Sequence, residues 1–533
     1  MNGEFGGGAI PLTFGDHYAI RLGAGAVHDS RMHYGVAVRR PGPPPTPEEL
    51  CELVAERVRV QAPALGYRLA GRGRWARWEP DPGFDPACHV EFHRLPPGAG
   101  VHQAVLEAMR VRPLSWDRPL WSLMVLHADS WPEHVLCYRA HHVFQDGMGI
   151  AGAARALLGG ETLPAPGGGA AYWRSPGPAR RALADLRRLA AASPPWFTAR
   201  DSACDGARES ARDGARGSAC DGACDGACDG ARDGARDGAR DGACDGAGGK
   251  VHDGAGGRGR DGAGGRACDG VSDSLGDRAA GDLRLEVVSL DLGPFHAIAR
   301  ATGASVAQIG LALVAGALRA WNSPTCHSPT CNPPAWNLSA WPAGPADPAN
   351  PARTAHPTHA AHPADLANPG EPVVALPVGL CGHRQHTGLG NHTGLLPMAL
   401  PCAEPSPLAR LARVAEQTTI KRIGHARQAA CTLYDLPAGL AVPLLRLLSP
   451  LFRKATPSRL SVTAVPLPKE LAAQGEVFAV PGLPPGLAGM VVIVPAGPSV
   501  TFSAVFDPRV SRSEELLGLL RKELTELHAQ ATR

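Results

Sequence analysis

The sequence has no long apolar run. None of its uninterrupted apolar stretches approaches the roughly 20 residues with which a helix crosses a bilayer. Its first residues, Met1–Phe5, have neither the basic start nor the apolar core of a secretory signal peptide. We therefore expect a cytoplasmic protein. If the protein contacts a membrane, we expect the contact to be peripheral, through the leucine-rich residues 440–451, although burial of that segment as a helix is the commoner outcome.

A dominant charge is also missing. The chain carries 53 Lys and Arg against 50 Asp and Glu, a formal net charge of +3. Proteins dedicated to nucleic-acid binding usually carry a clear excess of basic residues, so no nucleic-acid partner is expected. With 44% hydrophobic residues the chain can build ordinary globular cores, and its 533 residues suggest two to four domains.

Disulfides are not indicated, although the chain has 14 cysteines. Six of them lie in one low-complexity tract, and the other eight are scattered. The six are Cys204, Cys220, Cys224, Cys228, Cys244 and Cys268. Without a secretory signal, free thiols are the expected state.

The low-complexity tract, about Asp201–Gly281, repeats the unit Asp-Gly-Ala-Arg/Cys. It has almost no large apolar side chains, so it cannot bury enough surface to offset the entropy lost on ordering. We expect residues 198–282 to form a disordered linker. A metal-binding or redox role for its Asp and Cys residues is the less favoured alternative.

A second unusual stretch, Asn322–Gly370, is rich in Pro, Ala, Asn and His. Its cysteines and histidines fit no standard zinc spacing, and its prolines break regular backbone. We expect an exposed, disordered insertion at about 322–371 rather than a metal site. His383, His386 and His392, which follow it, could line a cleft, but exposed loop positions are commoner for such histidines.

The rest of the chain divides into two α/β halves, residues 1–197 and 283–533. A helix predicted at Pro47–Val60 has Thr46 as its cap, an early proline and two acids in its first turn. Expected in the first half are strands at 34–38, 90–92, 120–126 and 135–140, and helices at 101–109 and 148–158. Expected in the second half are strands at 283–288, 373–376, 398–400, 489–495 and 499–506, and helices at 305–321, 407–423 and 513–530.

The most informative segment is His141-His142-Val143-Phe144-Gln145-Asp146-Gly147, where a strand passes into a helix. Neighbouring residues on extended backbone point to opposite faces, so one histidine can face a cavity while the other braces the backbone. A neutral imidazole, with a pKa near ~6.5, can take a proton from a hydroxyl or an amine. Asp146 is expected to fix the loop through an arginine or backbone donors, and Gly147 to give the turn backbone freedom.

Simpler interpretations compete with this one. A histidine pair taken alone is more often structural than catalytic. It is also a poor metal site, because imidazoles that face opposite ways do not chelate one ion, and no third ligand is evident nearby. We therefore expect no metal here. The full spacing, with Asp four residues after the second histidine and Gly next, favours the catalytic interpretation.

The segment resembles the His-His-x-x-x-Asp-Gly signature of the acyltransferase superfamily that includes chloramphenicol acetyltransferase and nonribosomal condensation domains. Pro113–Trp121 resembles the "PLW" segment of one branch, the bacterial wax ester synthase/diacylglycerol acyltransferase family. Less specific matches to that family lie at Pro11–Asp16, Met32–Gly35, Gly303–Val306 and Leu389–Asn391. In all, the resemblance covers about residues 1–197, 283–321 and 372–530.

This resemblance implies an α/β fold of two chloramphenicol-acetyltransferase-like open-sheet lobes, which form a V with a central tunnel. It implies that His142 removes the acceptor proton, while His141, Asp146 and Gly147 hold the loop. Five further residues are expected to bind substrate, and these are Pro119, Leu120, Trp121, Gly390 and Asn391. For Pro119, Leu120 and Trp121, support of the loop or of the acyl tunnel is the favoured role.

The activity implied is transfer of a fatty acyl group from acyl-CoA to a long-chain alcohol or diacylglycerol, with acyl-CoA as substrate and no cofactor. Two segments depart from the family pattern. Ala307-Gln308 stands where the family usually has Asn-Asp, and Ala464–Pro468 where it usually has Asn-Val-Pro-Gly-Pro. Two alternatives therefore stay open: a free-standing condensation-type enzyme with a carrier-bound donor, and an inactive relative that binds acyl chains.

Overall fold

The computed structural model describes residues 8–22, 30–96, 98–129, 131–166, 283–321, 371–380, 386–434, 439–440, 442–445, 460–484, 487–508, 510 and 512–533. The predicted linker at 198–282, nearly all of the predicted insertion at 322–371, and His383 lie outside these residues.

The first half builds a five-stranded mixed sheet with the order β12-β2-β7-β6-β5. Four of its strands come from the first half, namely β2 (His33–Pro41), β5 (Val90–Arg94), β6 (Trp121–His127) and β7 (Glu133–His141). Strands β6 and β7 are buried along almost their whole length, as their apolar runs predicted. The motif strand β7 is therefore held between two neighbours, β2 and β6.

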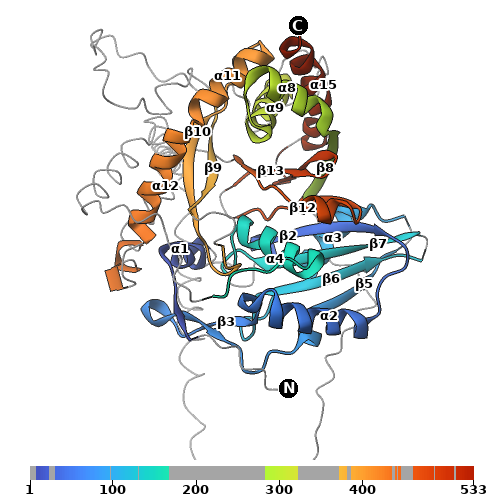
Figure 1. The fold of residues 1–533 in the computed structure, drawn as a ribbon, viewed down its shortest axis with the longest axis vertical. Coiled ribbons are helices and arrows are strands. Elements are labelled where there is room, and N and C mark those ends of the chain that lie inside the picture. Colours follow the sequence, from blue (N-terminus) through green and yellow to red (C-terminus); the bar gives the residue numbers. More distant parts are fainter. Residues whose placement is uncertain are drawn as a thin grey trace, which may run out of the picture. The chain divides into compact units, whose positions relative to one another are not determined.

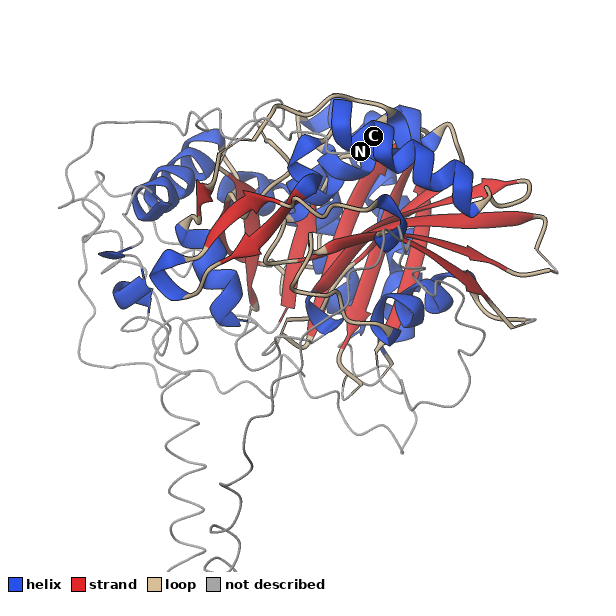
Figure 2. Cartoon of the chain, turned by 90° about the horizontal axis from the view of Figure 1, so that it is seen from below, coloured by secondary structure: helices blue, strands red, loops and turns tan. Residues whose placement is uncertain are grey.

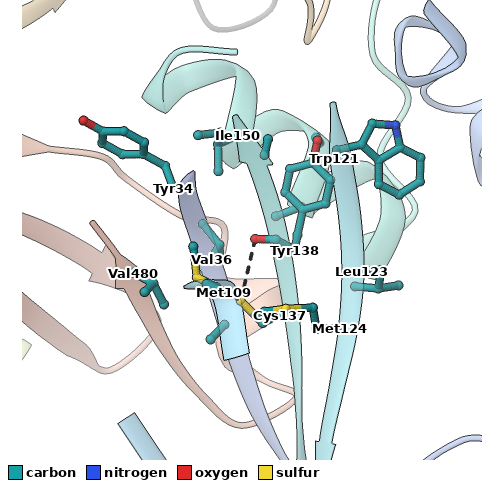
Figure 3. Close-up of a cluster of buried hydrophobic side chains, with 14 of the residues drawn as sticks. Tyr34, Val36, Met109, Trp121, Leu123, Met124, Cys137, Tyr138, Ile150 and Val480 are labelled. Carbon is teal, nitrogen blue, oxygen red and sulfur yellow. Dashed lines mark hydrogen bonds between the residues drawn. The ribbon is translucent and has the colours of Figure 1, made fainter. Parts of the chain in front are cut away.

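The fifth strand of this sheet comes from the second half of the sequence. β12 (Glu476–Val480) belongs to the second half by sequence, yet it pairs antiparallel with β2, with Val480 opposite Gly35. Figure 1 shows β12 beside β2, and Figure 3 shows Val480 near Val36 in the first core. Residues 283–533 therefore contribute one strand to the first sheet as well as the six strands of the second.

Three helices accompany the first sheet: α2 (Pro47–Val60), α3 (Val101–Val111) and α4 (Gly147–Gly159). Helix α2 begins as predicted, since Thr46 and Glu49 form a reciprocal capping box. It buries Leu50, Val54 and Val58, which recur every four residues along one face. Helix α4 contacts α2, β2 and β7, so the helix after the motif packs on the strand before it.

The second half builds a six-stranded sheet with the order β10-β9-β11-β13-β14-β8. Its strands are β8 (Arg284–Asp291), β9 (Val373–Gly379), β10 (Thr393–Ala399), β11 (Leu460–Ala464), β13 (Gly489–Ala496) and β14 (Ser499–Phe506). Side chains alternate along β13: Val491 and Ile493 enter the second core, whereas Val492 and Val494 belong to the first. One face of this sheet thus completes the core of the first half.

The helices of the second half are α8 (Leu292–Thr302), α9 (Val306–Trp321), α11 (Pro407–Gln417), α12 (Ile420–Tyr434), α14 (Lys469–Ala472) and α15 (Ser513–Ala531). Helices α8, α9, α11 and α15 contact one another and form the second core with the sheet (Figure 1). The helix predicted at 407–423 is two helices, because the chain breaks at Thr418, whose hydroxyl donates to the carbonyl of Val414 at 2.7 Å. The strand predicted at 398–400 begins earlier, at Thr393.

Smaller elements complete the described residues, and Figure 2 shows helices and strands mixed throughout the fold. A separate three-stranded sheet has the order β1-β4-β3, from β1 (Ile10–Pro11), β3 (Tyr67–Ala70) and β4 (Arg77–Pro80). Helix α1 (Phe14–Leu22) follows β1, and short 3-10 turns lie at Ser30–Met32, Pro63–Gly66, Gly73–Trp75 and Pro86–Cys88. The mixed α/β class and the two open sheets agree with the predicted fold class.

Two further sequence expectations can be compared with the described residues. The five cysteines among them are all free thiols, namely Cys51, Cys88, Cys137, Cys402 and Cys431. No single described helix is both long and apolar enough to span a membrane, and α8 with α9 meets those criteria only as a pair bent by 105°.

Candidate active site

The motif loop begins where β7 ends and stops where α4 begins. His141 is the last residue of β7, opposite His33 of β2. Its N–H donates to the carbonyl of Leu120 at 3.0 Å, and the next N–H, of His142, donates to the carbonyl of Met32 at 2.9 Å. The two histidines therefore leave the sheet with their backbone fixed from both sides.

The side chain of His141 is part of the protein interior. Its Nδ1 accepts the N–H of Val143 at 3.1 Å, so the ring braces the turn, as the sequence predicted for one of the two histidines. The edges of the His33 and Trp116 rings meet it at centroid distances of 5.7 and 5.2 Å. Burial, with help from His33 and His142, lowers the pKa of His141 to about 3, which keeps the imidazole neutral near pH 7.

The side chain of His142 faces another way and is only half-buried. Its ring meets the ring of Tyr34 edge-on, with centroids 4.5 Å apart. Its Nδ1 is enclosed and has no hydrogen-bond partner among the described residues. No described contact therefore occupies this imidazole with a structural hydrogen bond, in contrast to that of His141.

The backbone of the motif loop is held by a segment from the second half. The side-chain amide of Asn391 donates to the carbonyls of His142 and Val143, at 2.8 and 3.1 Å. The N–H of Gly390 donates to the carbonyl of Phe144 at 2.7 Å. Three successive carbonyls of the loop thus accept hydrogen bonds from two adjacent residues that lie about 250 residues later in the chain. The sequence predicted Gly390 and Asn391 as site residues, and the structure places them at the loop backbone.

Asp146 ends the loop and caps α4. One carboxylate oxygen accepts the N–H groups of Met148 and Gly149 at 3.0 and 2.9 Å. The same oxygen lies 3.1 Å from Nε2 of His386, and the other oxygen accepts the N–H of His392 at 2.8 Å and the hydroxyl of Thr393 at 2.7 Å. Backbone donors were expected for Asp146. Arginine was the alternative expectation; among the described residues the side-chain ring that faces Asp146 is instead that of His386.

The charge state of Asp146 follows from these partners. Its complete burial opposes ionisation, but the His386 ring, its hydrogen bond, the His392 ring and the N–H of Gly149 together outweigh it. They hold the pKa of Asp146 well below its usual range. Nδ1 of His386 accepts the N–H of Gly388 at 3.0 Å, so Nε2 carries the proton that faces Asp146.

Gln145 connects the loop to the first sheet and to the same second-half segment. The hydroxyl of Tyr138 donates to its side-chain oxygen at 2.7 Å, and its side-chain nitrogen donates to the carbonyl of Gly388. Gln145 also forms a parallel bridge with Gly390. The fully buried amide thereby joins β7 to the segment that holds His142.

The glycine of the motif does not have the predicted role. Gly147 lacks a positive φ, it is exposed, and a Cβ there would meet only Val465, at 3.6 Å. The tight position is Gly149, where a Cβ would lie 3.0 Å from the His386 ring and 3.2 Å from Cβ of Gln145. Helix α4 can approach His386 only because residue 149 has no side chain.

The three residues of the "PLW" segment brace the motif strand. Leu120 and Trp121 are fully buried, and Pro119 is buried beside them. The indole N–H of Trp121 donates to the carbonyl of Leu65 at 2.8 Å, and its ring stacks on His89 at 4.4 Å (Figure 3 shows Trp121 beside Tyr138). The carbonyl of Leu120 receives the N–H of His141. These contacts favour the supporting role that the sequence left open over direct substrate contact.

The two departures from the family pattern have different surroundings. Gln308 caps α9, since its side-chain oxygen accepts the N–H of Ser305 at 2.8 Å, and its nitrogen donates to Thr418 at 2.9 Å. Val465, in the Ala464–Pro468 segment, is the residue nearest to the position of a Cβ on Gly147. The second departure therefore adjoins the start of α4, whereas the first makes contacts within the second half.

Four residues at the site were missed or undervalued in the sequence. His386 and His392 are buried, which corrects the expectation of exposed loop positions. Thr393 and Asp16 had no predicted role, although Asp16 ends the opening segment that carried part of the resemblance. For His386, His392 and Thr393 the available signal is the cluster of polar residues around Gly390-Asn391, and Asp16 has no such local signal. No group of three or more His, Cys, Asp or Glu residues in the described part of the chain could hold a metal ion.

Comparison with known proteins gives one family match and several partial likenesses. Residues 26–213 match the wax ester synthase/diacylglycerol acyltransferase catalytic domain, which confirms the family resemblance for this part of the chain. A Mycobacterium bovis protein provisionally named a diacylglycerol O-acyltransferase is 29% identical over 102 residues, 19% of this chain and 22% of that protein. A Mycobacterium tuberculosis protein with the same provisional name is 33% identical over 75 residues, 14% and 16% of the two chains.

The chain thus spans about a fifth of the length of the curated relatives it matches. Among solved structures, the wax ester synthase/diacylglycerol acyltransferase of Marinobacter aquaeolei VT8 has a TM-score of 0.46 at 16% identity, over 98% of this chain and 100% of that one. The starter condensation domain of rhizomide synthetase, in complex with C8-CoA and Leu-SNAC, has a TM-score of 0.49 at 12% identity, over 100% and 96%.

Proposed function

We propose that this chain, which is related to the wax ester synthase/diacylglycerol acyltransferase family through residues 26–213, is an acyl-CoA-dependent O-acyltransferase. It would transfer a fatty acyl group from the thioester to the hydroxyl of a long-chain alcohol or a diacylglycerol. His142 would be the general base. Acyl-CoA is a substrate in this proposal, and no cofactor takes part.

One observation carries the proposal. Of the two adjacent histidines, His141 is buried and its Nδ1 accepts the N–H of Val143, while His142 is half-buried and its enclosed Nδ1 has no hydrogen-bond partner among the described residues. The backbone around His142 is meanwhile fixed by Met32 and Asn391. A rigid loop that presents an unused imidazole is what general-base catalysis requires.

The chemistry follows from a neutral imidazole at this position. The acceptor oxygen attacks the thioester carbonyl carbon while His142 removes the hydroxyl proton. The tetrahedral intermediate then loses the CoA thiolate, and the imidazolium returns its proton to that sulfur. The C–O bond forms in the first step and the C–S bond breaks in the second. His142 takes up one proton and returns one, so the reaction has no net proton change. A positioned base of this kind contributes about 10²–10⁴-fold to a rate.

Asp146 supports this cycle without touching the substrate. Its carboxylate is enclosed by donors from α4 and from residues 386–393, so it remains charged and joins the two halves behind the loop. We assign it a positioning role. His141, neutral and packed, has the same kind of role.

The site of lipid supply is a further part of the proposal. A long-chain acceptor would be taken up from a membrane or lipid-droplet surface through exposed apolar side chains. In the described part of residues 440–451, Leu440 is 61% exposed whereas Leu445 is 1% exposed. Both earlier expectations for this segment, exposure and burial, thus have a residue that supports them.

The test is release of free thiol from palmitoyl-CoA by the purified protein, with a long-chain alcohol, a diacylglycerol or no acceptor. We expect release that depends on the acceptor and is lost in His142→Ala, with ester formed in equal amount. Retained turnover in His142→Ala would rule out the general base. Release equal to the acceptor-free background with every acceptor would direct the work to carrier-bound thioesters, and failure there to an acyl-binding role.

A further inference from the structure

A buried carboxylate outside the motif is bonded to the residue that holds the motif loop. Asp16, in α1, is 1% exposed. One of its oxygens accepts the backbone N–H of Asn391 at 2.7 Å and the side-chain amide of Asn391 at 3.3 Å. That same amide nitrogen donates to the carbonyl of His142 at 2.8 Å. Asp16 is thus connected to the backbone of His142 through one side chain.

The second oxygen of Asp16 anchors the carboxylate to the first half. It accepts the N–H of Thr13 at 2.9 Å and the indole N–H of Trp78 at 3.3 Å. The hydroxyl of Thr13 in turn donates to the carbonyl of Asn391 at 3.3 Å. Three segments that are distant in sequence, α1, β4 and the loop before β10, therefore meet at one carboxylate.

The chemistry of this cluster requires a carboxylate. All four groups that face Asp16 are N–H donors, and an ionised carboxylate is an acceptor only, with about four lone-pair sites. An asparagine at this position would have to turn its NH₂ group toward two of these donors. The close approach also depends on Gly390, which has φ of +80° and where a Cβ would lie 3.2 Å from the carboxylate.

The bonds to Asp16 limit the orientations that the Asn391 side chain can adopt. Its amide nitrogen carries two hydrogens for three acceptors, the carbonyls of His142 and Val143 and the Asp16 oxygen. Asp16 fixes the backbone and the side chain of Asn391 together. Loss of that constraint would let the amide rotate away from the loop, and the His142 ring would lose its fixed position.

We propose that Asp16 is a positioning residue for His142, acting through Asn391. The inference rests on the proposed function for its effect on turnover, but its structural claim stands apart from that function. Asp16 does not touch the substrate in this proposal. It determines how well the base is aligned, so its loss should lower kcat and leave KM for acyl-CoA nearly unchanged.

The kinetic test is Asp16→Asn, which preserves size, beside Asp81→Asn as a matched control. Asp81 is also a buried aspartate of the first half, 7% exposed, but it accepts the N–H of Gly83 and has no bond to the loop. We expect kcat of Asp16→Asn to fall about 10- to 100-fold, as expected for a misaligned reacting group. Asp81→Asn should keep kcat. Equal kcat losses in the two variants would overturn the proposal.

A double-mutant cycle with Asn391→Ala tests whether Asp16 acts through Asn391. If it does, Asp16→Asn added to Asn391→Ala should lower kcat much less than it does in the wild-type background. Fully additive effects would show an independent role and contradict the proposal. If Asp16→Asn does not fold, Trp78→Phe replaces it, because it removes one hydrogen bond from Asp16 and should give a smaller loss in kcat alone.

A readout without turnover separates this inference from the proposed function. The rate at which diethyl pyrocarbonate modifies His142, followed by mass spectrometry of the full chain, reports on the exposure of that ring. We expect faster modification in Asp16→Asn than in the wild type and an unchanged rate in Asp81→Asn. If the wild type releases no thiol, the proposed function fails, and this rate still decides the inference: identical rates in all three proteins would refute it.

Discussion

The two faces of the motif loop differ more than their sequence suggests. On the packed face, His141 is 2% exposed, enclosed by His33 and Trp116, and bonded to the turn it precedes. On the open face, His142 is half-buried and its side chain has no described hydrogen bond, whereas in His141 only Nε2 lacks a described partner. The same contrast recurs after the loop, since Gly149 is buried against His386 and Gly147 is exposed.

This contrast shows that His141 and His142 differ in role because their surroundings differ, although the residue type is the same. Two identical side chains one residue apart point to opposite faces of extended backbone, so one joins a core and the other meets the site. The packed face turns an imidazole into a structural acceptor by lowering its pKa. The open face leaves an imidazole available for proton transfer.

The largest difference between the two faces is expected when each histidine is replaced by alanine. We expect His142→Ala to lower turnover by about 10²–10⁴-fold, the usual contribution of a general base, with an unfolding midpoint close to that of the wild type. His141→Ala should instead lower stability by about 1–3 kcal/mol, because it leaves the buried N–H of Val143 without an acceptor. Urea unfolding measures the stability of both variants, and thiol release measures their turnover. Equal stability losses in the two variants would remove the distinction between the faces.

The packed face should also show in the pH dependence of stability. The folded protein keeps His141 neutral, with a pKa of about 3, whereas the unfolded chain takes up a proton near pH 6.5. Stability from this group is therefore complete above about pH 6.5 and is lost as the pH falls toward 3. His33, with a pKa lowered to about 3 by burial and by Arg139, acts in the same direction.

His141→Phe should flatten the acid limb by up to about 1.4 kcal/mol per pH unit between pH 6.5 and 3. Urea unfolding at four pH values in this range, beside the wild type, gives the two slopes. Parallel curves would mean that the unfolded and folded proteins protonate this residue alike.

The smallest expected effects concern Gly149 and Gly147, where an added methyl group should change stability by different amounts. Gly149→Ala should cost about 1–3 kcal/mol, because the new Cβ meets the His386 ring and Gln145 in a packed site. Gly147→Ala should be neutral or stabilise by less than about 1 kcal/mol, because alanine favours the helix and only Val465 lies nearby. Thermal unfolding of both variants decides the order. A larger loss for Gly147→Ala would place the steric constraint in the motif glycine after all.

Much of the first half could be predicted because its signals are local. The capping box of α2, the apolar runs of β6 and β7 and the turn after His142 depend on residues a few positions apart. The pattern predicts one helix where the structure has α11 and α12. Threonine can lie within a helix or end one, and here Thr418 ends α11, with its hydroxyl bonded to the carbonyl of Val414.

The rest of the site could not be predicted, because it is made by pairs about 240 to 375 residues apart in sequence. Nothing near Asp146 indicates that its partner is His386, and nothing near Asp16 indicates Asn391. Periodicity reports which face of an element is buried, but not what lies against it. The backbone donors expected at Asp146 are present, but the histidine that joins them lies 240 residues away and has no local signal. The backbone freedom expected of Gly147 was wrong, because this residue has no positive φ.

The pairing of β12 with β2 has a consequence during synthesis of the chain. β2 is complete once about 41 residues have been synthesised, but its edge partner, Glu476–Val480, follows more than 400 residues later. Until then one row of backbone N–H and C=O groups on β2 stays open, and open strand edges recruit foreign strands. The edge of β2 is therefore covered only after most of the chain has left the ribosome, and until then it is available to other strands.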